Sequence, residues 1–351
     1  MDRTKARRRG VLLGTLAAGA AAGLAAERYL VGRDRRRPDP EAREPFGELR
    51  GRDTGPVSSF DGTKLHVEVA GNSGPTIVLA HGFSLNLTLW HYQIRDLPPR
   101  FRLVLFDQRG HGRSEKAKEG DWSLDALARD LEAVIRAHGG PDPVAVVGHS
   151  MGGMGLLRFC ELYPELIGTK VAALALVNTT AADVMGGMFP RRVKAALQMI
   201  QEGAVRALAS NSGRVDALRG RTRDLAYLAV RAAGLGPKAL PSVVEFTDRM
   251  LNDTPSEVWA RLLPGLLSLD VSTVLDVIDV PTLVVTGTHD RLTPPGAAER
   301  IAAGIKGSEL VVMRDVGHMS MLERPHSFNA RLRAFLAGVP ALGLGVRPAA
   351  G

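Results

Sequence analysis

From residue 64 onward, short apolar runs alternate with longer stretches in which apolar residues recur every three or four positions. The first run, residues 64–71, alternates apolar with polar side chains, which is typical of a half-buried antiparallel strand. The later runs are rich in Val, Leu and Ala, and the continuously apolar ones among them predict buried strands of a parallel sheet. The six later strands are expected within residues 75–82, 100–110, 143–150, 170–180, 281–290 and 308–317.

Helical periodicity fills the segments between these runs. The clearest helices are expected within residues 125–140, 151–164, 295–305 and 324–338. Strands that alternate with helices predict an α/β fold, in which a mostly parallel sheet is covered on both faces.

Residues 181–270 depart from this alternation, because they show helical apolar spacing and no convincing strand. We interpret them as a helical cap inserted between the two parts of one core, residues 54–180 and 271–340. The last residues, 341–351, are predicted to form a loose tail.

The first 53 residues, which precede this core, have a different pattern. A basic stretch leads into an uncharged run of 17 residues, residues 10–26, which is the layout of a secretory signal or a signal anchor. Arg8-Arg9 and the residues after them resemble a twin-arginine export signal, and the run is marginal in length for a membrane span. We therefore expect a membrane-anchored or exported protein, with possible membrane association through residues 10–26. A cytoplasmic protein with a basic tail is the alternative, and residues 32–53 are expected to be a charged linker that contains proline.

The net charge of +8 does not indicate nucleic-acid binding, because of where it lies. Residues 1–53 hold 13 Lys and Arg against 8 Asp and Glu, so this segment supplies +5 and the remaining chain only +3. We expect no nucleic-acid partner. The single cysteine, Cys160, excludes an internal disulfide, and no His, Cys, Asp or Glu cluster has the spacing of metal ligands. Neither a metal nor another cofactor is expected, and no feature sets the oligomeric state.

Residues 148–152 read Gly-His-Ser-Met-Gly and fit the pattern G-x-S-x-G between an apolar run and a helical stretch. In such a strand-to-helix turn the serine is exposed above the sheet. Gly148 and Gly152 are expected to provide clearance, because larger side chains would collide with the neighbouring strand and helix. Ser150 is therefore the predicted nucleophile, and the alternative is a small residue in an ordinary tight turn.

A serine hydroxyl needs a base, and the base needs an acid that orients it. In the chain order serine, acid, histidine, Asp290 ends one apolar run and His318 follows the next. We predict that Asp290 orients His318 and that His318 takes the proton of Ser150. The alternatives are a helix-capping role for Asp290 and a turn role for His318, and Asp315 is a rival acid.

Acyl transfer also requires hydrogen-bond donors for the oxyanion. One predicted donor is the backbone N–H of Met151, which follows the nucleophile. The second is the N–H of Phe83, in the loop His81-Gly82-Phe83 after an apolar run, where Gly82 lets the backbone approach a substrate.

Together these motifs resemble the α/β-hydrolase family, in its bacterial branch with a helical cap. The resemblance covers residues 57–340 and rests on HGF at 81–83, DQRGHGRS at 107–114, GHSMGG at 148–153, GTHDRLTPP at 287–295 and GHMSMLERP at 317–325. It implies an α/β fold with a mostly parallel eight-stranded sheet, helices on both faces and a helical cap insertion. It further implies that Asp107, Arg109 and Gly110 shape a loop rather than catalyse. Relatives that dehalogenate or open epoxides carry Asp in place of Ser150, which argues against those activities.

A serine nucleophile with this machinery implies attack on the carbonyl carbon of an ester, thioester or amide. The cap methionines Met185, Met188, Met199 and Met250 either accept an aliphatic chain or pack the cap helices. We expect a carboxylesterase- or lipase-like hydrolase that cleaves small lipophilic esters through an acyl-enzyme intermediate. The alternatives are a cofactor-free perhydrolase or haloperoxidase, a hydrolase of C–C bonds, and a non-catalytic ligand-binding protein.

Overall fold

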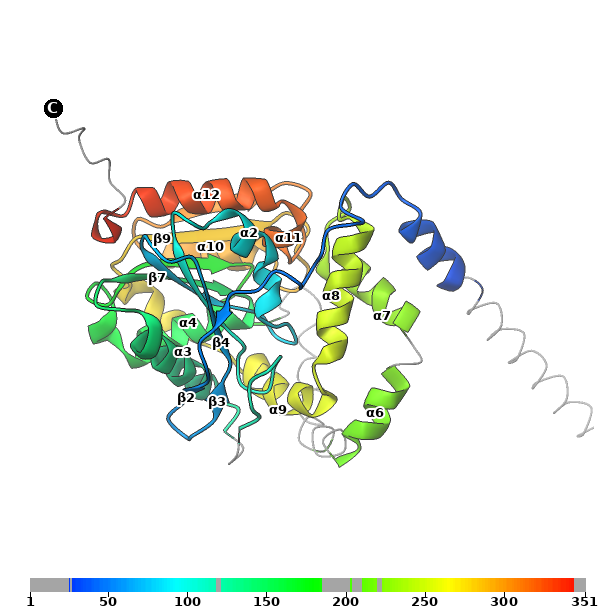
Figure 1. Ribbon diagram of the computed structural model, residues 1–351, viewed down its shortest axis with the longest axis horizontal. Helices are drawn as coiled ribbons and strands as arrows, with labels where there is room; N and C mark the ends of the chain where they lie inside the picture. The colour runs from blue at the N-terminus through cyan, green and yellow to red at the C-terminus, as the bar shows by residue number, and fades with distance from the viewer. Residues whose placement is uncertain are drawn as a thin grey trace, which may run out of the picture.

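The computed structural model describes residues 25, 27–117, 121–184, 203, 210–219 and 223–343. At its centre is an eight-stranded sheet (Figure 1), which is parallel except that its second strand pairs antiparallel with both neighbours. In spatial order the strands are β1 (Arg52–Asp53), β4 (Val67–Ala70), β6 (Arg102–Phe106), β5 (Thr76–Ala80), β7 (Val144–His149), β8 (Val171–Val177), β9 (Thr282–Gly287) and β10 (Glu309–Met313). The predicted α/β class and mostly parallel eight-stranded sheet are confirmed.

The order of strand addition reverses next to β5. The strand that follows β5 in sequence, β6, lies on one side of it, and β7 lies on the other. In open α/β sheets, ligands bind beyond the carboxyl ends of the strands at such a point. Ala80 at the end of β5 pairs with Gly148 of β7, so the topology places residues 81–84 beside Ser150.

Helices cover both faces of the sheet, and Figure 1 shows α12 and α2 on one side and α3 and α4 on the other. The first face packs against α2 (His91–Asp96), α11 (Ser320–Glu323) and α12 (Pro325–Ala337), and the second against α3 (Leu124–His138), α4 (Met151–Leu162) and α10 (Pro295–Gly304). The start of α3 illustrates why the local sequence forms a helix. The hydroxyl of Ser123 accepts a hydrogen bond from the N–H of Ala126 (3.2 Å), which caps the helix, and Leu127, Leu131 and Val134 then recur on its buried face.

The strand expected over residues 64–71 is divided between two sheets. Its first part, β3 (Lys64–Leu65), pairs with β2 (Val57–Ser58) in a separate two-stranded sheet, while β4 joins the main sheet. The break lies at His66, whose N–H donates to Ser114 Oγ (2.8 Å) instead of to a neighbouring strand. Short helical turns complete the core, namely η1 (Leu87–Trp90), η2 (Pro164–Leu166), η4 (Ser272–Val277) and η5 (Pro340–Leu342).

The described part of the cap is helical and is attached to both faces of the core. Its elements are α6 (Ser212–Arg219), α7 (Arg223–Ala229), the π-helical turn η3 (Val230–Gly234), α8 (Pro241–Asp253) and α9 (Ser256–Leu267). The buried side chains of α8 join the core of the first face, and those of α9 join the core of the second. The ends of the insertion are adjacent, since Ala182 and Asp270 form an isolated β-bridge. Of the predicted cap, residues 185–202, 204–209 and 220–222 lie outside the described residues, and with them Met185, Met188 and Met199.

Residues 27–46, which we call the N-terminal arm, pack against the cap and the core, although the sequence predicts a charged linker from residue 32 onward. The arm starts with a helix over residues 27–35, and its Val31 and Phe46 side chains are buried. Phe46 stacks on Phe246 of α8, with ring centroids 5.0 Å apart, and meets Tyr92 of α2 edge-on at 5.7 Å. The arm therefore bridges the cap and the core.

Several of the charges that suggested a linker have partners in the fold. Arg35 pairs with Glu245 of α8 (2.9 Å), and Glu44 pairs with His91 of α2 (2.8 Å). No helix in the described part of the chain is long and apolar enough to cross a membrane. Residues 10–26, to which the sequence analysis assigns the possible membrane association, lie outside the described residues apart from Ala25, as do residues 344–351 of the predicted tail.

Candidate active site

Residues 148–152 form a sharp turn between β7 and α4. Ser150 has φ +51° and ψ −118°, a conformation that L residues rarely adopt and that stores backbone strain. A Cβ atom on Gly148 would lie 2.6 Å from the carbonyl oxygen of Gly152, and one on Gly152 would lie 2.4 Å from that of Ala80. Neither position has room for a side chain.

The backbone of Ser150 is held by the neighbouring strand. Its N–H donates to the carbonyl of Val177, at the end of β8 (3.0 Å), and its own carbonyl accepts from Thr179 Oγ1 (2.7 Å). Because α4 begins at Met151, the positive end of the helix dipole also points at the serine. These contacts fix the predicted nucleophile above the carboxyl edge of the sheet.

Asp290 and His318 form a buried pair. Asp290 Oδ2 lies 2.9 Å from His318 Nδ1, and both side chains are almost inaccessible to solvent. The other carboxylate oxygen accepts from the backbone N–H groups of Leu292 (3.0 Å) and Thr293 (2.9 Å). A carboxylate in this position fixes the orientation of the imidazole and leaves its Nε2 for proton transfer.

Asn178 and Thr293 complete the surroundings of Asp290. Asn178 Nδ2 donates to Asp290 Oδ2 (2.9 Å) and to the carbonyl of Gly317 (3.1 Å), and Thr293 Oγ1 donates to Asp290 Oδ2 (2.8 Å). Burial raises the pKa of Asp290, but the charge of His318 and these hydrogen bonds outweigh it and hold that pKa below its ordinary value. Asp290 is therefore ionised at neutral pH. The sequence motifs do not single out either partner. Their only signal is their place after strands, Asn178 directly after β8 and Thr293 six residues after the end of β9.

His149 connects the turn at Ser150 to the loop that carries His318. Its Nε2 lies 2.9 Å from the carbonyl oxygen of His318, and the two rings are 4.9 Å apart. A Cβ atom on Gly82 would lie 2.7 Å from His149 Nδ1 and 3.1 Å from Ser150 Cβ. The predicted nucleophile, base and oxyanion loop, which are far apart in sequence, thus meet around His149.

Two buried histidines hold the loop that carries Phe83. His81 Nε2 accepts from the N–H of Gln108 (3.0 Å), and His111 Nε2 accepts from the N–H of Ser84 (3.0 Å). A ring nitrogen accepts only when the imidazole is neutral. Burial secures this state, since it lowers the pKa of His111 to about 4 and that of His81 well below its ordinary value. Within the described part of the chain, the N–H groups of Phe83 and Met151 have no acceptor.

Residues 75–325, well over half of the chain, match the sequence profile of the alpha/beta hydrolase fold. The chain belongs to this family. A 2-hydroxy-6-oxononadienedioate/2-hydroxy-6-oxononatrienedioate hydrolase of Klebsiella pneumoniae is 29% identical over 281 residues, which cover 78% of this chain and 91% of the relative. A pimeloyl-[acyl-carrier protein] methyl ester esterase of Nitrosomonas europaea is 27% identical and matches 75% of this chain and 96% of its own. Among solved structures, a thermophilic esterase of Thermogutta terrifontis superposes with a TM-score of 0.67 at 26% identity, over 82% of this chain and 99% of that one.

In this α/β hydrolase, Asp107 and Arg109 make structural contacts, as the resemblance implies. Asp107 accepts from the N–H groups of Leu87 (2.7 Å) and Arg113 (2.9 Å). Arg109 Nη2 lies 2.7 Å from Asp130 Oδ1, and both side chains are buried. Among the residues that the structure describes, no group of three or more His, Cys, Asp or Glu side chains is placed to hold a metal ion.

The cap contributes an aromatic residue that the sequence analysis did not single out. Trp259 of α9 packs against Phe83, with ring centroids 5.1 Å apart, and the guanidinium of Arg219 lies 5.0 Å from the Trp259 ring. Phe83 is only half-buried, so aromatic surface remains beside the predicted oxyanion donor. Nothing in the sequence distinguishes Trp259 from any other aromatic residue of an amphipathic helix.

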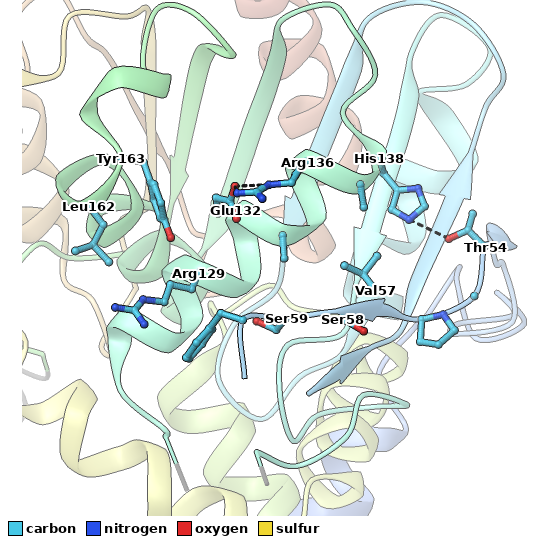
Figure 2. Close-up of a pocket in the computed structure, with 15 residues that line it drawn as sticks. Thr54, Val57, Ser58, Ser59, Arg129, Glu132, Arg136, His138, Leu162 and Tyr163 are labelled. Carbon is cyan, nitrogen blue, oxygen red and sulfur yellow. Dashed lines mark hydrogen bonds and ion pairs between the residues drawn. The ribbon is translucent and has the colours of Figure 1, made fainter. Parts of the chain in front are cut away.

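A cavity of about 820 Å³ lies away from these residues, and Figure 2 shows it between β2 and α3. Its lining includes Arg129, Arg136, His138 and Tyr163, but none of the predicted site residues. Among its lining residues, the mostly exposed Arg136 guanidinium pairs with Glu132, and His138 Nε2 lies 3.4 Å from Thr54 Oγ1. This cavity is therefore separate from the chemistry described above.

Proposed function

We propose that this α/β hydrolase cleaves carboxylic ester bonds of lipophilic substrates through a Ser150-His318-Asp290 triad. The observation that carries the proposal is the convergence of a strained Ser150 turn with the buried Asp290–His318 pair, whose Nδ1–Oδ2 distance is 2.9 Å. A non-catalytic binding protein on this scaffold would not require an ionised aspartate that orients a histidine beside a strained serine.

The reaction follows from these positions. Ser150 Oγ attacks the carbonyl carbon while His318 takes the serine proton, and the N–H groups of Phe83 and Met151 bind the oxyanion. The tetrahedral intermediate then collapses, the C–O bond to the alcohol breaks, and His318 returns the proton to the departing oxygen. Water, deprotonated by His318, attacks the acyl-enzyme in the same way and releases the acid.

Two features support a neutral, lipophilic ester. Phe83 and Trp259 place aromatic surface beside the reacting carbonyl, and this surface suits an apolar group. Two arginines of the cap already donate to backbone carbonyls, Arg219 to that of Leu251 (2.7 Å) and Arg231 to that of Gly236 (2.8 Å). The esterases among the relatives and the solved structures agree with this class of substrate.

C–C bond hydrolysis is a second candidate, because the Klebsiella relative is a hydrolase of a 2-hydroxy-6-oxo dioate. A dioate carries two carboxylates, and a buried carboxylate requires a cationic or hydrogen-bonding partner. The engagement of Arg219 and Arg231 with backbone carbonyls favours the ester over such a dianion.

A substrate panel tests the proposal. Purified protein is assayed with short- and medium-chain p-nitrophenyl esters and with the dienedioate of the Klebsiella enzyme, alongside Ser150→Ala and labelling by a fluorophosphonate probe. We expect ester turnover and labelling, and a loss of about 10⁴-fold or more in kcat with Ser150→Ala. Ser73→Ala, an exposed serine at the other end of β5, is the matched control and should retain full activity. Hydrolysis of the dienedioate alone, or equal rates for Ser150→Ala and wild type, would refute ester hydrolysis.

We also propose that residues 10–26 direct the chain to export or hold it at a membrane. The support is their uncharged, Ala- and Gly-rich composition behind Arg8-Arg9. Membrane fractionation with N-terminal sequencing of the mature protein tests this, and a cytosolic protein that begins at Met1 would contradict it.

A further inference from the structure

The loop that carries His318 touches the cap backbone-to-backbone. A Cβ atom on Gly236 would lie 2.5 Å from the carbonyl oxygen of Asp315, and one on Gly317 would lie 2.5 Å from the nitrogen of Gly236. The N–H of His318 donates to the carbonyl of Gly234, at the end of η3 (2.9 Å). The contact therefore needs glycine on both sides, and it connects the predicted catalytic base directly to the cap.

One carboxylate holds this contact together. Glu323 Oε2 accepts from the N–H of Gly236 (2.7 Å), and Oε1 accepts from the N–H groups of Gly317 (2.8 Å) and Met319 (3.4 Å). Glu323 thus binds the amides on both sides of His318 and, at the same time, an amide of the cap. Its side chain does not touch Asp290 or Ser150 in any contact of the described residues.

Burial of the Glu323 carboxylate in this position costs free energy. It is 6% exposed, and burial raises the pKa of its carboxyl although the three N–H groups favour the ionised form. A buried carboxylate is tolerated where amide groups would otherwise lack acceptors. The proposed reaction uses no acid at this position, so we explain the burial of Glu323 by the three amide groups that it binds.

We propose that Glu323 is a positioning residue, which fixes the His318 loop against cap residues 234–236 and so makes the placement of the imidazole depend on a seated cap. The proposal rests on the proposed function, since it takes His318 as the base. Asp290 sets the rotation of the ring through Nδ1, whereas Glu323 sets the position of the backbone from which the ring projects. If the cap segment withdraws, Glu323 loses the Gly236 amide and the loop loses its connection at Gly234.

Glu323→Gln tests the proposal, because the amide keeps the size of the side chain but has one acceptor oxygen in place of two. Its NH₂ group would face a backbone N–H. We expect kcat for a p-nitrophenyl ester to fall roughly 10- to 100-fold with KM changed by less than about threefold, because a misplaced base slows the chemical step more than binding. Glu309→Gln, at the exposed start of β10, is the matched control and should behave as wild type.

Hydrogen exchange supplies a readout that does not depend on turnover. In Glu323→Gln, the amides of residues 317–319 and 234–236 should exchange faster than in wild type, while those of α3 and β7 keep their protection. Gly236→Ala forces the same two segments apart with Glu323 intact, and it serves as the second variant if Glu323→Gln is too unstable to measure. It should give the same split between kcat and KM and the same local exchange.

The outcomes separate the two proposals. Wild-type kcat and wild-type exchange in Glu323→Gln would overturn the positioning role, and so would a loss of kcat without faster exchange in the two segments. A wild-type protein that hydrolyses no ester, in which Glu323→Gln still exposes both segments to exchange, would refute the proposed function and leave the connection between loop and cap established.

Discussion

Two aspartates stand close to His318 in the chain or in space, and their surroundings differ. Asp290 is buried and bonded to His318 Nδ1 at 2.9 Å. Asp315, the rival acid, occupies a turn with φ +60° and pairs instead with Lys238 at the surface (2.7 Å). Only Asp290 has the amide and hydroxyl donors that keep a buried carboxylate ionised. At the scale of the residue, hydrogen bonding rather than sequence distance supports Asp290 as the proposed acid.

Asp290→Asn should lower kcat/KM for a p-nitrophenyl ester about 10⁴-fold. An amide that donates to Nδ1 favours the wrong imidazole tautomer, so His318 can no longer take the serine proton. Asp315→Asn is the matched control, since asparagine tolerates the same positive φ, and its activity should stay within about twofold of wild type. The assignment would be wrong if Asp290→Asn kept a tenth of the activity or if Asp315→Asn lost most of it.

At the scale of elements, the N-terminal arm joins the cap to the core. Asp34 Oδ2 accepts from the hydroxyl of Tyr227 (2.7 Å), and the N–H of Ser242, at the start of α8, donates to Asp39 (2.7 Å). On the core side, Glu44 pairs with His91 (2.8 Å). Phe46 lies between the two groups of contacts and is buried against Phe246. The arm is thus part of the folded hydrolase rather than a spacer in front of it.

Phe46→Ala should therefore lower the free energy of unfolding by roughly 3 kcal/mol, the range found for buried phenylalanines. Phe60→Ala, at a position that is 47% exposed, is the matched control and should cost less than about 1 kcal/mol. Urea unfolding followed by circular dichroism measures both. Equal losses of stability for the two variants would show that Phe46 packs no more tightly in solution than an exposed ring.

The sequence predicts those elements whose structure is determined by residues close to each other in the chain. The turn at Ser150 could be predicted because the apolar strand, the two glycines and the helix that create it lie within a few residues of each other. Asn178 and Glu323 could not, because their partners, Asp290 and Gly236, reach them only through the fold. The packing of the N-terminal arm could not be predicted for a related reason. A charged residue that pairs with a distant helix cannot be distinguished in the sequence from one that stays in water.

At the scale of the whole molecule, buried neutral histidines stand at the carboxyl edge of the sheet. His81, His111 and His149 are inaccessible to solvent and come from three different segments. Burial lowers the pKa of His111 to about 4 and that of His149 to about 3, whereas an unfolded histidine titrates near 6.5. Between these limits the unfolded chain binds protons that the folded chain does not. The contribution of each such histidine to stability must then fall as the pH drops below 6.5, by up to about 1.4 kcal/mol per pH unit.

His111→Gln should reduce this dependence, because glutamine offers an oxygen to the N–H of Ser84 but does not titrate. We expect the free energy of unfolding, measured in urea at pH 6.0 and 5.0, to change by about 1.4 kcal/mol per pH unit less than in wild type. Glu323, whose pKa is raised by burial, acts in the opposite sense, but it is present in both proteins and cancels in the comparison. His326→Gln, at an exposed position of α12, is the matched control and should keep the wild-type slope. If the free energy of unfolding changed equally with pH in His111→Gln and wild type, His111 would be protonated in the folded protein. Its Nε2 could then not accept the hydrogen bond that holds the Phe83 loop.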